Sequence, residues 1–209
     1  MRRFDRLTEQ LQLTLVISRA EARPRTIMAL AEEVFAGGVT AIQLREKDLP
    51  DSEFYKEAKE LREFCFHHRK VLIINDRIDI ALAVNADGVH LGQSDLPAEA
   101  AAKILPKDKI LGVSANTLEA ARLAIRFGAD YLGVGAIFPT GSKDDASVIS
   151  DQEARNIINL GLPAIAIGGI KAENAGAVWG MGFGGLAVIS ALSAASDPKS
   201  IASKIIAAQ

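Results

Sequence analysis

The chain has 209 residues, which is long enough for one well-buried α/β domain or for two small ones. Hydrophobic residues make up 49% and aromatic residues only 5%, so the core must be aliphatic, as in parallel strands that are buried on both faces. The formal net charge is −2, without long blocks of like charge, which argues against a nucleic-acid or membrane surface.

Cysteine content and hydropathy exclude further classes. The single cysteine, Cys65, rules out an internal disulfide and any zinc or iron–sulfur site built from several cysteines. No apolar run approaches the ~20 residues of a membrane span. Acidic and amide residues interrupt the apolar run that a signal peptide would need near the basic N-terminal segment. We therefore expect a soluble, cytoplasmic protein.

Strand-like apolar runs alternate with helical patterns along the whole chain. The expected strands span residues 13–18, 41–45, 71–75, 88–91, 110–114, 131–138, 164–168 and 186–190. The expected helices lie near residues 25–37, 51–69, 77–85, 97–105, 117–128, 150–160, 171–181 and 197–208. This alternation is typical of the α/β fold known as the (β/α)₈ TIM barrel. Because no linker or low-complexity segment interrupts it, we expect residues 1–209 to form a single barrel domain with its chemistry after the strands.

The second expected strand ends in a group of polar side chains. With a side-chain period of two, Gln43 and Arg45 point the same way, into the barrel, and Lys47 follows in the loop. An amide, a guanidinium and an ammonium together suit an anionic group such as diphosphate. The alternative is an ordinary charged loop in which Arg45, Glu46 and Lys47 pair with one another.

Two carboxylates, Asp76 and Asp95, stand just beyond the ends of the third and fourth expected strands. Parallel neighbours lie about 4.8 Å apart, so both residues could share one rim of a sheet. Close carboxylates repel, and a divalent cation is the usual reason to hold them together. Either aspartate could instead cap the helix that follows it. The pair is therefore a candidate metal site, with helix capping as the alternative.

The fifth strand ends in Ser114, whose hydroxyl could bind a phosphate oxygen or cap the next helix. Taken alone, the residue fits capping better. His90 lies inside the fourth strand and is expected to be a packed core residue, while His67 and His68 fall at a helix end, where the dipole favours a cation. No Ser–His–Asp or Cys–His order suits covalent hydrolysis, and no GxGxxG motif follows the first strand.

Possible phosphate-binding groups follow the last three strands. Thr140, Ser142 and Lys143 surround a glycine after the sixth strand, and such groups can wrap a phosphate although the Walker spacing is absent. The seventh and eighth strands are followed by small residues and free backbone amides, which is where this fold binds phosphate. Tight barrel packing would also favour small residues there.

Six segments, in order, resemble the thiamin phosphate synthase family and cover nearly the whole chain. They are QLREK (43–47), NDRIDIALAVNADGVHLGQSDLP (75–97), GVSANT (112–117), GADYLGVGAIFPTGSK (128–143), AIGGI (166–170) and AVISAL (187–192). The chain departs from the family pattern at Ser142, where a second threonine is usual, and at Ala136, where a proline is common. It also has GFGG at residues 182–185, where Gly-Ala-Asp-Gly would be expected.

The resemblance implies a (β/α)₈ transferase of thiamine biosynthesis that depends on Mg²⁺ and joins hydroxymethylpyrimidine diphosphate to thiazole phosphate, releasing diphosphate. It places Gln43, Arg45, Lys47, Asn75, Ser114 and Lys143 on the pyrimidine diphosphate. Mg²⁺ would be bound by Asp76 and Asp95. The thiazole phosphate would be held by Thr140, Ser142, Gly169, Ile189 and Ser190.

The implied reaction needs no nucleophile from the protein. Diphosphate leaves from a methylene carbon, an electron-rich aminopyrimidine stabilises the remaining cation, and the thiazole nitrogen attacks. The protein must supply positive charge and hydrogen-bond donors around the departing oxygens. Arg45, Lys47, Lys143 and Ser114 are the candidate catalytic residues.

Two other functions stay open. A thiazole tautomerase shares the barrel but typically lacks the paired aspartates and carries a histidine near the position of Ser114. A non-catalytic barrel that binds a phosphorylated ligand would keep the pocket, although the intact metal and diphosphate groups argue against it. We expect small-molecule substrates as partners, in a monomer or a homo-oligomer.

Overall fold

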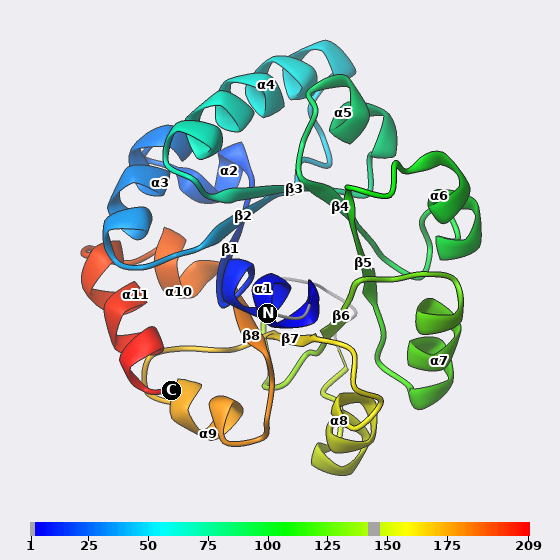
Figure 1. Ribbon diagram of the computed structural model, residues 1–209. Helices are drawn as coiled ribbons and strands as arrows, with labels where there is room; N and C mark the ends of the chain where they lie inside the picture. Colours follow the sequence, from blue (N-terminus) through cyan, green and yellow to red (C-terminus); the bar gives the residue numbers. More distant parts are fainter. Residues whose placement is uncertain (1–2, 142–146) are drawn as a thin grey trace.

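The computed structural model describes residues 3–141 and 147–209 and contains a closed parallel barrel (Figure 1). Each strand pairs with the next, and the first pairs with the last, in the order β1 to β8. The strands are β1 (Leu13–Ile17), β2 (Ala41–Leu44), β3 (Val71–Asn75), β4 (Gly88–Leu91), β5 (Ile110–Ser114), β6 (Tyr131–Val134), β7 (Ala164–Ile167) and β8 (Gly185–Val188). The expected (β/α)₈ TIM barrel is confirmed.

Helices surround the barrel on all sides. They are α1 (Arg3–Gln10), α2 (Arg19–Ala22), α3 (Ile27–Ala36), α4 (Asp51–His67), α5 (Ile78–Ala83), α6 (Ala98–Ile104), α7 (Leu118–Arg126), α8 (Asp151–Ile158), α9 (Ala175–Trp179), α10 (Ser190–Ser193) and α11 (Pro198–Ala207). The sequence pattern did not predict α1, α2 or α10. The last two have only four residues each, too few to display a helical period. Within the described part of the chain, no helix combines the length and apolar character needed to cross a membrane.

Three expected strands, β1, β2 and β7, end one residue earlier than predicted, and two others, β6 and β8, end earlier by two residues or more. The run that begins at Tyr131 continues to Phe138, but β6 ends at Val134. Ala136 and Ile137 are nevertheless buried. The sixth strand was predicted too long because an apolar pattern reports burial, whereas a strand also requires continuous pairing with its neighbours. For the same reason the eighth strand, expected to reach Ser190, ends at Val188, and Ser190 begins α10.

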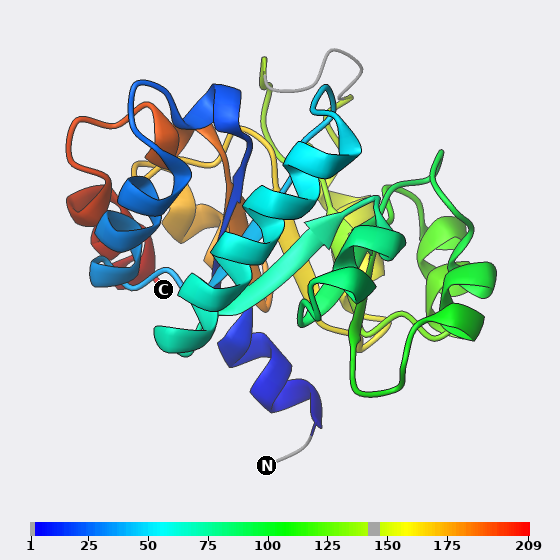
Figure 2. The same cartoon turned by 90° about the horizontal axis from the view of Figure 1, so that it is seen from above.

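The N-terminal end of the barrel is closed by α1, which lies across that end of the molecule (Figure 2). Leu7 and Leu11 are buried there against side chains from inside the barrel, among them Val16, Ile73 and Ile165. Burial of each leucine contributes roughly 2 kcal/mol. With this end filled by apolar side chains, a ligand can enter the barrel only from the C-terminal ends of the strands.

The unusual segment 182–185 also lies at the closed end. Before β4 and β6, the carboxylates of Asp87 and Asp130 accept hydrogen bonds from the backbone N–H groups of Leu72 (2.8 Å) and Leu111 (2.9 Å). Gly184 holds the matching position before β8, and a Cβ there would stand 3.2 Å from Cγ2 of Thr8 in α1. The missing aspartate therefore affects the packing of α1 and not the open end of the barrel.

Candidate functional site

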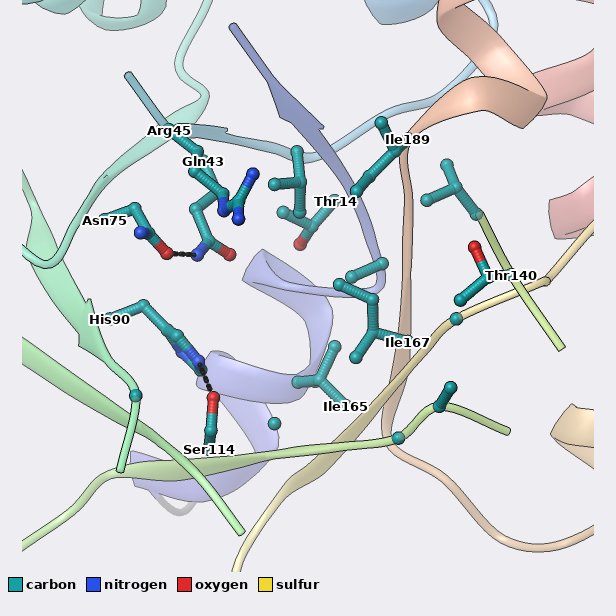
Figure 3. Close-up of a pocket in the computed structure, with 18 of the residues that line it drawn as sticks. Thr14, Gln43, Arg45, Asn75, His90, Ser114, Thr140, Ile165, Ile167 and Ile189 are labelled. Atoms are coloured by element: carbon teal, nitrogen blue, oxygen red, sulfur yellow. Dashed lines mark hydrogen bonds between the residues drawn. The ribbon is translucent and has the colours of Figure 1, made fainter. Parts of the chain in front are cut away.

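A cavity of about 610 Å³ opens at the C-terminal ends of the strands (Figure 3). Every sequence-predicted site residue that the structure describes lines it: Gln43, Arg45, Lys47, Asn75, Asp76, Asp95, Ser114, Thr140, Gly169, Ile189 and Ser190. Ser142 and Lys143 lie outside the described residues. Residues far apart in the sequence thus meet around one space.

Alternation along β2 and β3 directs an amide pair into this cavity. Gln43 Nε2 donates a hydrogen bond of 2.7 Å to Asn75 Oδ1, and both side chains are buried (Figure 3). Leu44 belongs to the core between strands and helices. Arg45 directly follows β2. Its backbone N–H donates to the carbonyl of Ile17 in β1 over 2.8 Å, so the backbone at Arg45 stays beside the neighbouring strand.

The charged side chains of the loop after β2 do not form ion pairs with one another in the described residues. The carboxylate of Glu46 accepts a hydrogen bond from the backbone N–H of Arg19. In the described residues no ion pair joins Glu46 to Arg45 or Lys47. The interpretation of an ordinary self-paired loop is therefore wrong, and Glu46 instead ties the loop to the start of α2. Both cationic side chains line the cavity.

Neither aspartate caps a helix, so the capping alternative is wrong. Asp76 adopts φ 63°, and its backbone N–H donates to the carbonyl of His90 over 2.8 Å. Asp95 accepts a 2.6 Å hydrogen bond from the N–H of Gly92. The positions before α5 and α6 are Arg77 and Pro97, and neither makes a side-chain cap.

The carboxyl groups of Asp76 and Asp95 are close enough to interact directly. Burial, and then the neighbouring Asp95, raise the pKa of Asp76 to about 6, while Lys47 and Arg45 act in the opposite direction. Among the described residues no group of three or more His, Cys, Asp or Glu side chains could hold a metal ion. A carboxylate pair is still the ligand set that suits Mg²⁺, because this ion usually keeps several waters and binds one or two carboxylates together with substrate phosphates.

Ser114 contacts a histidine, and its expected capping role is wrong. Thr117 caps α7, accepting a hydrogen bond from the N–H of Ala120. Ser114 Oγ lies 2.9 Å from His90 Nε2, and His90 Nδ1 lies 2.9 Å from the hydroxyl oxygen of Tyr131. His90 is buried as expected, but it lines the cavity and is more than a packing residue.

Sequence reasoning missed several polar residues of the cavity wall. The period of two could have placed His90, because its neighbours Val89 and Leu91 both belong to the outer core. The others follow strands in loops or lie deep in the barrel, where no motif marks them. The missed polar residues are Thr14, His90, Gln93, Ser94, Asn116, Tyr131 and Lys171.

The opposite wall is formed by β6, β7 and β8 with the segments that follow them. Ile165, Ile167 and Ile189 present apolar surface beside Thr140 (Figure 3). Gly169 has φ 65°, and a Cβ there would lie 2.8 Å from the carbonyl oxygen of Pro139 and 2.9 Å from that of Phe138. Its small size is therefore required by close packing against the loop after β6.

Comparison with known proteins identifies the family of the chain. The family model described as thiamine monophosphate synthase matches residues 13–192. The chain is 49% identical over 190 residues to the thiamine-phosphate synthase of Clostridium tetani, covering 90% of each chain. It is 46% identical to that of Methanobrevibacter smithii, again over 90% of each chain.

Solved structures extend the similarity to three dimensions. The thiamine phosphate pyrophosphorylase from Pyrococcus furiosus superposes with a TM-score of 0.88 at 39% identity, over 97% of this chain and 96% of that one. A 3-hexulose-6-phosphate synthase reaches a TM-score of 0.72 at 20% identity, which reflects the fold alone. The chain belongs to the thiamine monophosphate synthase family and is a transferase of thiamine biosynthesis.

Proposed function

We propose that the chain joins hydroxymethylpyrimidine diphosphate to thiazole phosphate, forming thiamin phosphate and free diphosphate. One observation carries the proposal: the paired carboxylates of Asp76 and Asp95 face the same cavity as Arg45 and Lys47. Acidic and basic groups on one wall suit a diphosphate that arrives with a divalent cation. The similarity to proteins named thiamine-phosphate synthase supports the same reaction.

The amide pair supplies a place for the pyrimidine diphosphate. Because Gln43 Nε2 donates to Asn75 Oδ1, the cavity is offered the acceptor Gln43 Oε1 and the donor Asn75 Nδ2. The hydrogen bond between the two side chains fixes which end of each amide faces the ligand. A ring that carries both a donor and an acceptor can then match the pair in only one orientation.

The residues of this wall act on the leaving group. Arg45 and Lys47 place positive charge where diphosphate departs, and Ser114 adds a neutral hydrogen-bond donor. Lys143 would contribute a further ammonium group. The carboxylates of Asp76 and Asp95 would hold Mg²⁺, which when bound would supply additional positive charge against the departing oxygens. The reaction is then dissociative, and the aminopyrimidine itself stabilises the cation that remains.

The second substrate binds across the cavity. The hydroxyls of Thr140 and Ser190, the backbone at Gly169 and Ile189, and the hydroxyl of Ser142 would hold the thiazole phosphate. The apolar side chains of Ile165 and Ile167 exclude water from the space between the substrates. The ring nitrogen can therefore meet the electron-poor carbon before water does.

A coupling assay tests the proposed reaction. Purified protein with Mg²⁺ is expected to release diphosphate only when both substrates are present, because the bound thiazole supplies the nitrogen that captures the carbon. Release is measured with a coupled inorganic pyrophosphatase, and thiamin phosphate by chromatography. Release with the pyrimidine diphosphate alone, or none with both substrates, would contradict the proposal. No release is what a thiazole tautomerase or a non-catalytic phosphate-binding barrel would give.

Metal affinity is expected to rise with pH between about 5 and 7. Asp76 must lose its proton to bind a cation, and its pKa is raised to about 6. Binding of Mn²⁺, which takes the same oxygen ligands as Mg²⁺, can be followed by electron paramagnetic resonance at each pH without any substrate. Asp76→Asn should flatten this dependence as well as weaken binding. A wild-type affinity that does not change across the interval would show that the pair is not the metal site.

A further inference from the structure

A chain of hydrogen-bonding groups runs along the barrel wall through three adjacent strands. It begins at Tyr131 in β6, passes through the ring of His90 in β4, and ends at Ser114 in β5, with both links measuring 2.9 Å. Tyr131 and His90 are 4% and 8% exposed, whereas Ser114 is partly open to the cavity. Through Ser114, the two buried groups are linked to the more open part of the cavity.

Two glycines make room for this chain. A Cβ at Gly112 would stand 2.2 Å from Tyr131 Cζ, and a Cβ at Gly133 would stand 2.7 Å from His90 Cε1. Gly112 and Ser114 lie on the inward face of β5, and Tyr131 and Gly133 lie on that of β6. Gly112 is beside Tyr131 in the sheet, and Ser114 is beside Gly133. The barrel interior is thus shaped to let both rings lie where the links form.

The direction of the hydrogen bonds follows from Tyr131. Burial raises the pKa of this phenol, so it keeps its proton. Among the described residues, its hydroxyl has one hydrogen-bond partner, His90 Nδ1, so the phenol proton points to that nitrogen. A neutral imidazole that accepts at Nδ1 carries its proton on Nε2. Nε2–H therefore donates to Ser114 Oγ, and the serine proton is directed elsewhere.

We propose that Tyr131 and His90 are positioning residues that make Ser114 a hydrogen-bond donor toward an anionic oxygen of the substrate. With one lone pair of Oγ occupied by His90, the hydroxyl presents its proton to the cavity. In the opposite arrangement, Ser114 would donate to the ring and turn its lone pairs toward a diphosphate, which is repulsive. The inference rests on the proposed function, because it identifies that oxygen as one of the departing diphosphate.

Kinetics on paired variants test the link between His90 and Ser114. His90→Leu is expected to lower kcat by about 10-fold to 100-fold, the range for losing one oriented donor to developing negative charge. His90→Gln should recover most of the loss, since its amide N–H can replace Nε2–H. The double variant of His90→Leu with Ser114→Ala should be no slower than Ser114→Ala alone, because both act through one hydroxyl. His67→Leu, at an exposed helix end, is the matched control and should leave kcat unchanged.

Nitrogen-15 spectra of the free protein test the tautomer directly. The chain has three histidines, and Nδ1 of His67 and of His68 faces a backbone carbonyl oxygen, which can only accept. Those two should show Nδ1–H, whereas His90 should show Nε2–H. Tyr131→Phe should shift the His90 Nδ1 resonance, because it removes the donor, and should leave His67 and His68 as they are.

The inference is overturned by additive effects in the double variant, by His90→Gln that is as slow as His90→Leu, or by Nδ1–H at His90. It can fail while wild-type protein still couples the two substrates, which would leave the proposed function standing. If wild-type protein does not release diphosphate, the proposed function fails, and the spectra still report the tautomer because they need no substrate.

Discussion

Asp76→Asn and Asp95→Asn are each expected to reduce turnover by about 10²-fold to 10³-fold while the barrel stays folded. Each change removes one of the two carboxylates that would hold Mg²⁺, and with it much of the positive charge that opposes the leaving diphosphate. Turnover is measured by diphosphate release with both substrates at saturating Mg²⁺, and folding by circular dichroism. Asp79→Asn, which alters a surface ion pair with Arg77, is the matched control and should change turnover little.

Without metal, Asp76→Asn should leave the stability of the protein unchanged or raise it, although the same substitution lowers its activity. The folded-state pKa of Asp76 is raised to about 6 from its ordinary 3.8, so its charged form is disfavoured in the folded protein. The resulting stabilisation by the bound proton is complete below about pH 4 and is lost as pH rises through 6. In chelator at pH 7 Asp76→Asn should therefore melt at or above the wild-type temperature, and the difference should vanish near pH 4. Full turnover in Asp76→Asn or in Asp95→Asn would show that the substituted residue does not bind the metal.

Gly169→Ala is expected to lower kcat/KM for the thiazole phosphate by about 10-fold to 100-fold. Gly169 has φ 65°, where an added Cβ costs roughly 1–2 kcal/mol. That Cβ would also press on Phe138 Cβ at 2.7 Å and on two carbonyl oxygens, pushing the loop after β6 away from the proposed phosphate site. The measurement is steady-state kinetics with each substrate varied in turn, and the KM for the pyrimidine diphosphate should change much less.

Gly161→Ala is the control for backbone strain. Gly161 has φ 82°, but no atom beyond its chain neighbours lies within 4 Å of the place that an added Cβ would take, and it precedes β7 at the other end of the barrel. Its substitution carries the backbone strain without the contacts, so it should lower stability, but less than Gly169→Ala, and should change neither KM. If both glycine variants impaired the thiazole KM equally, strain and not the local contact would explain the effect.

Together these predictions separate the two walls of the cavity. The wall formed by β2 to β5 holds the paired carboxylates, Arg45, Lys47 and the amide pair, and the wall formed by β6 to β8 holds mainly small and apolar residues, with Lys171 after β7. Changes on the first wall should act mainly on departure of diphosphate. Changes on the second should act mainly on capture of the acceptor.

The sequence alone determined the architecture and the location of the chemistry. Alternating apolar runs and helical patterns were enough to predict the closed barrel, because each βα unit displays its own period. Polar residues after the strands, such as Arg45 and Asp76, could be assigned to the open end because parallel strands all end at the same rim. The bounds of β3, β4 and β5 were predicted to the residue, since polar or glycine residues stop each run abruptly.

Only the tertiary structure decided which side chains touch. That Ser114 contacts His90 instead of capping a helix, and that Glu46 binds the backbone at Arg19 instead of its own neighbours, depends on the registers between strands and on how each loop folds back. The closure of one barrel end by Leu7 and Leu11 likewise joins segments that share no local pattern. Periodicity along a chain indicates whether a side chain is buried and which face of the strand it lies on. Which other side chain it contacts depends on how the strands pair when the barrel closes, and no single segment encodes that pairing.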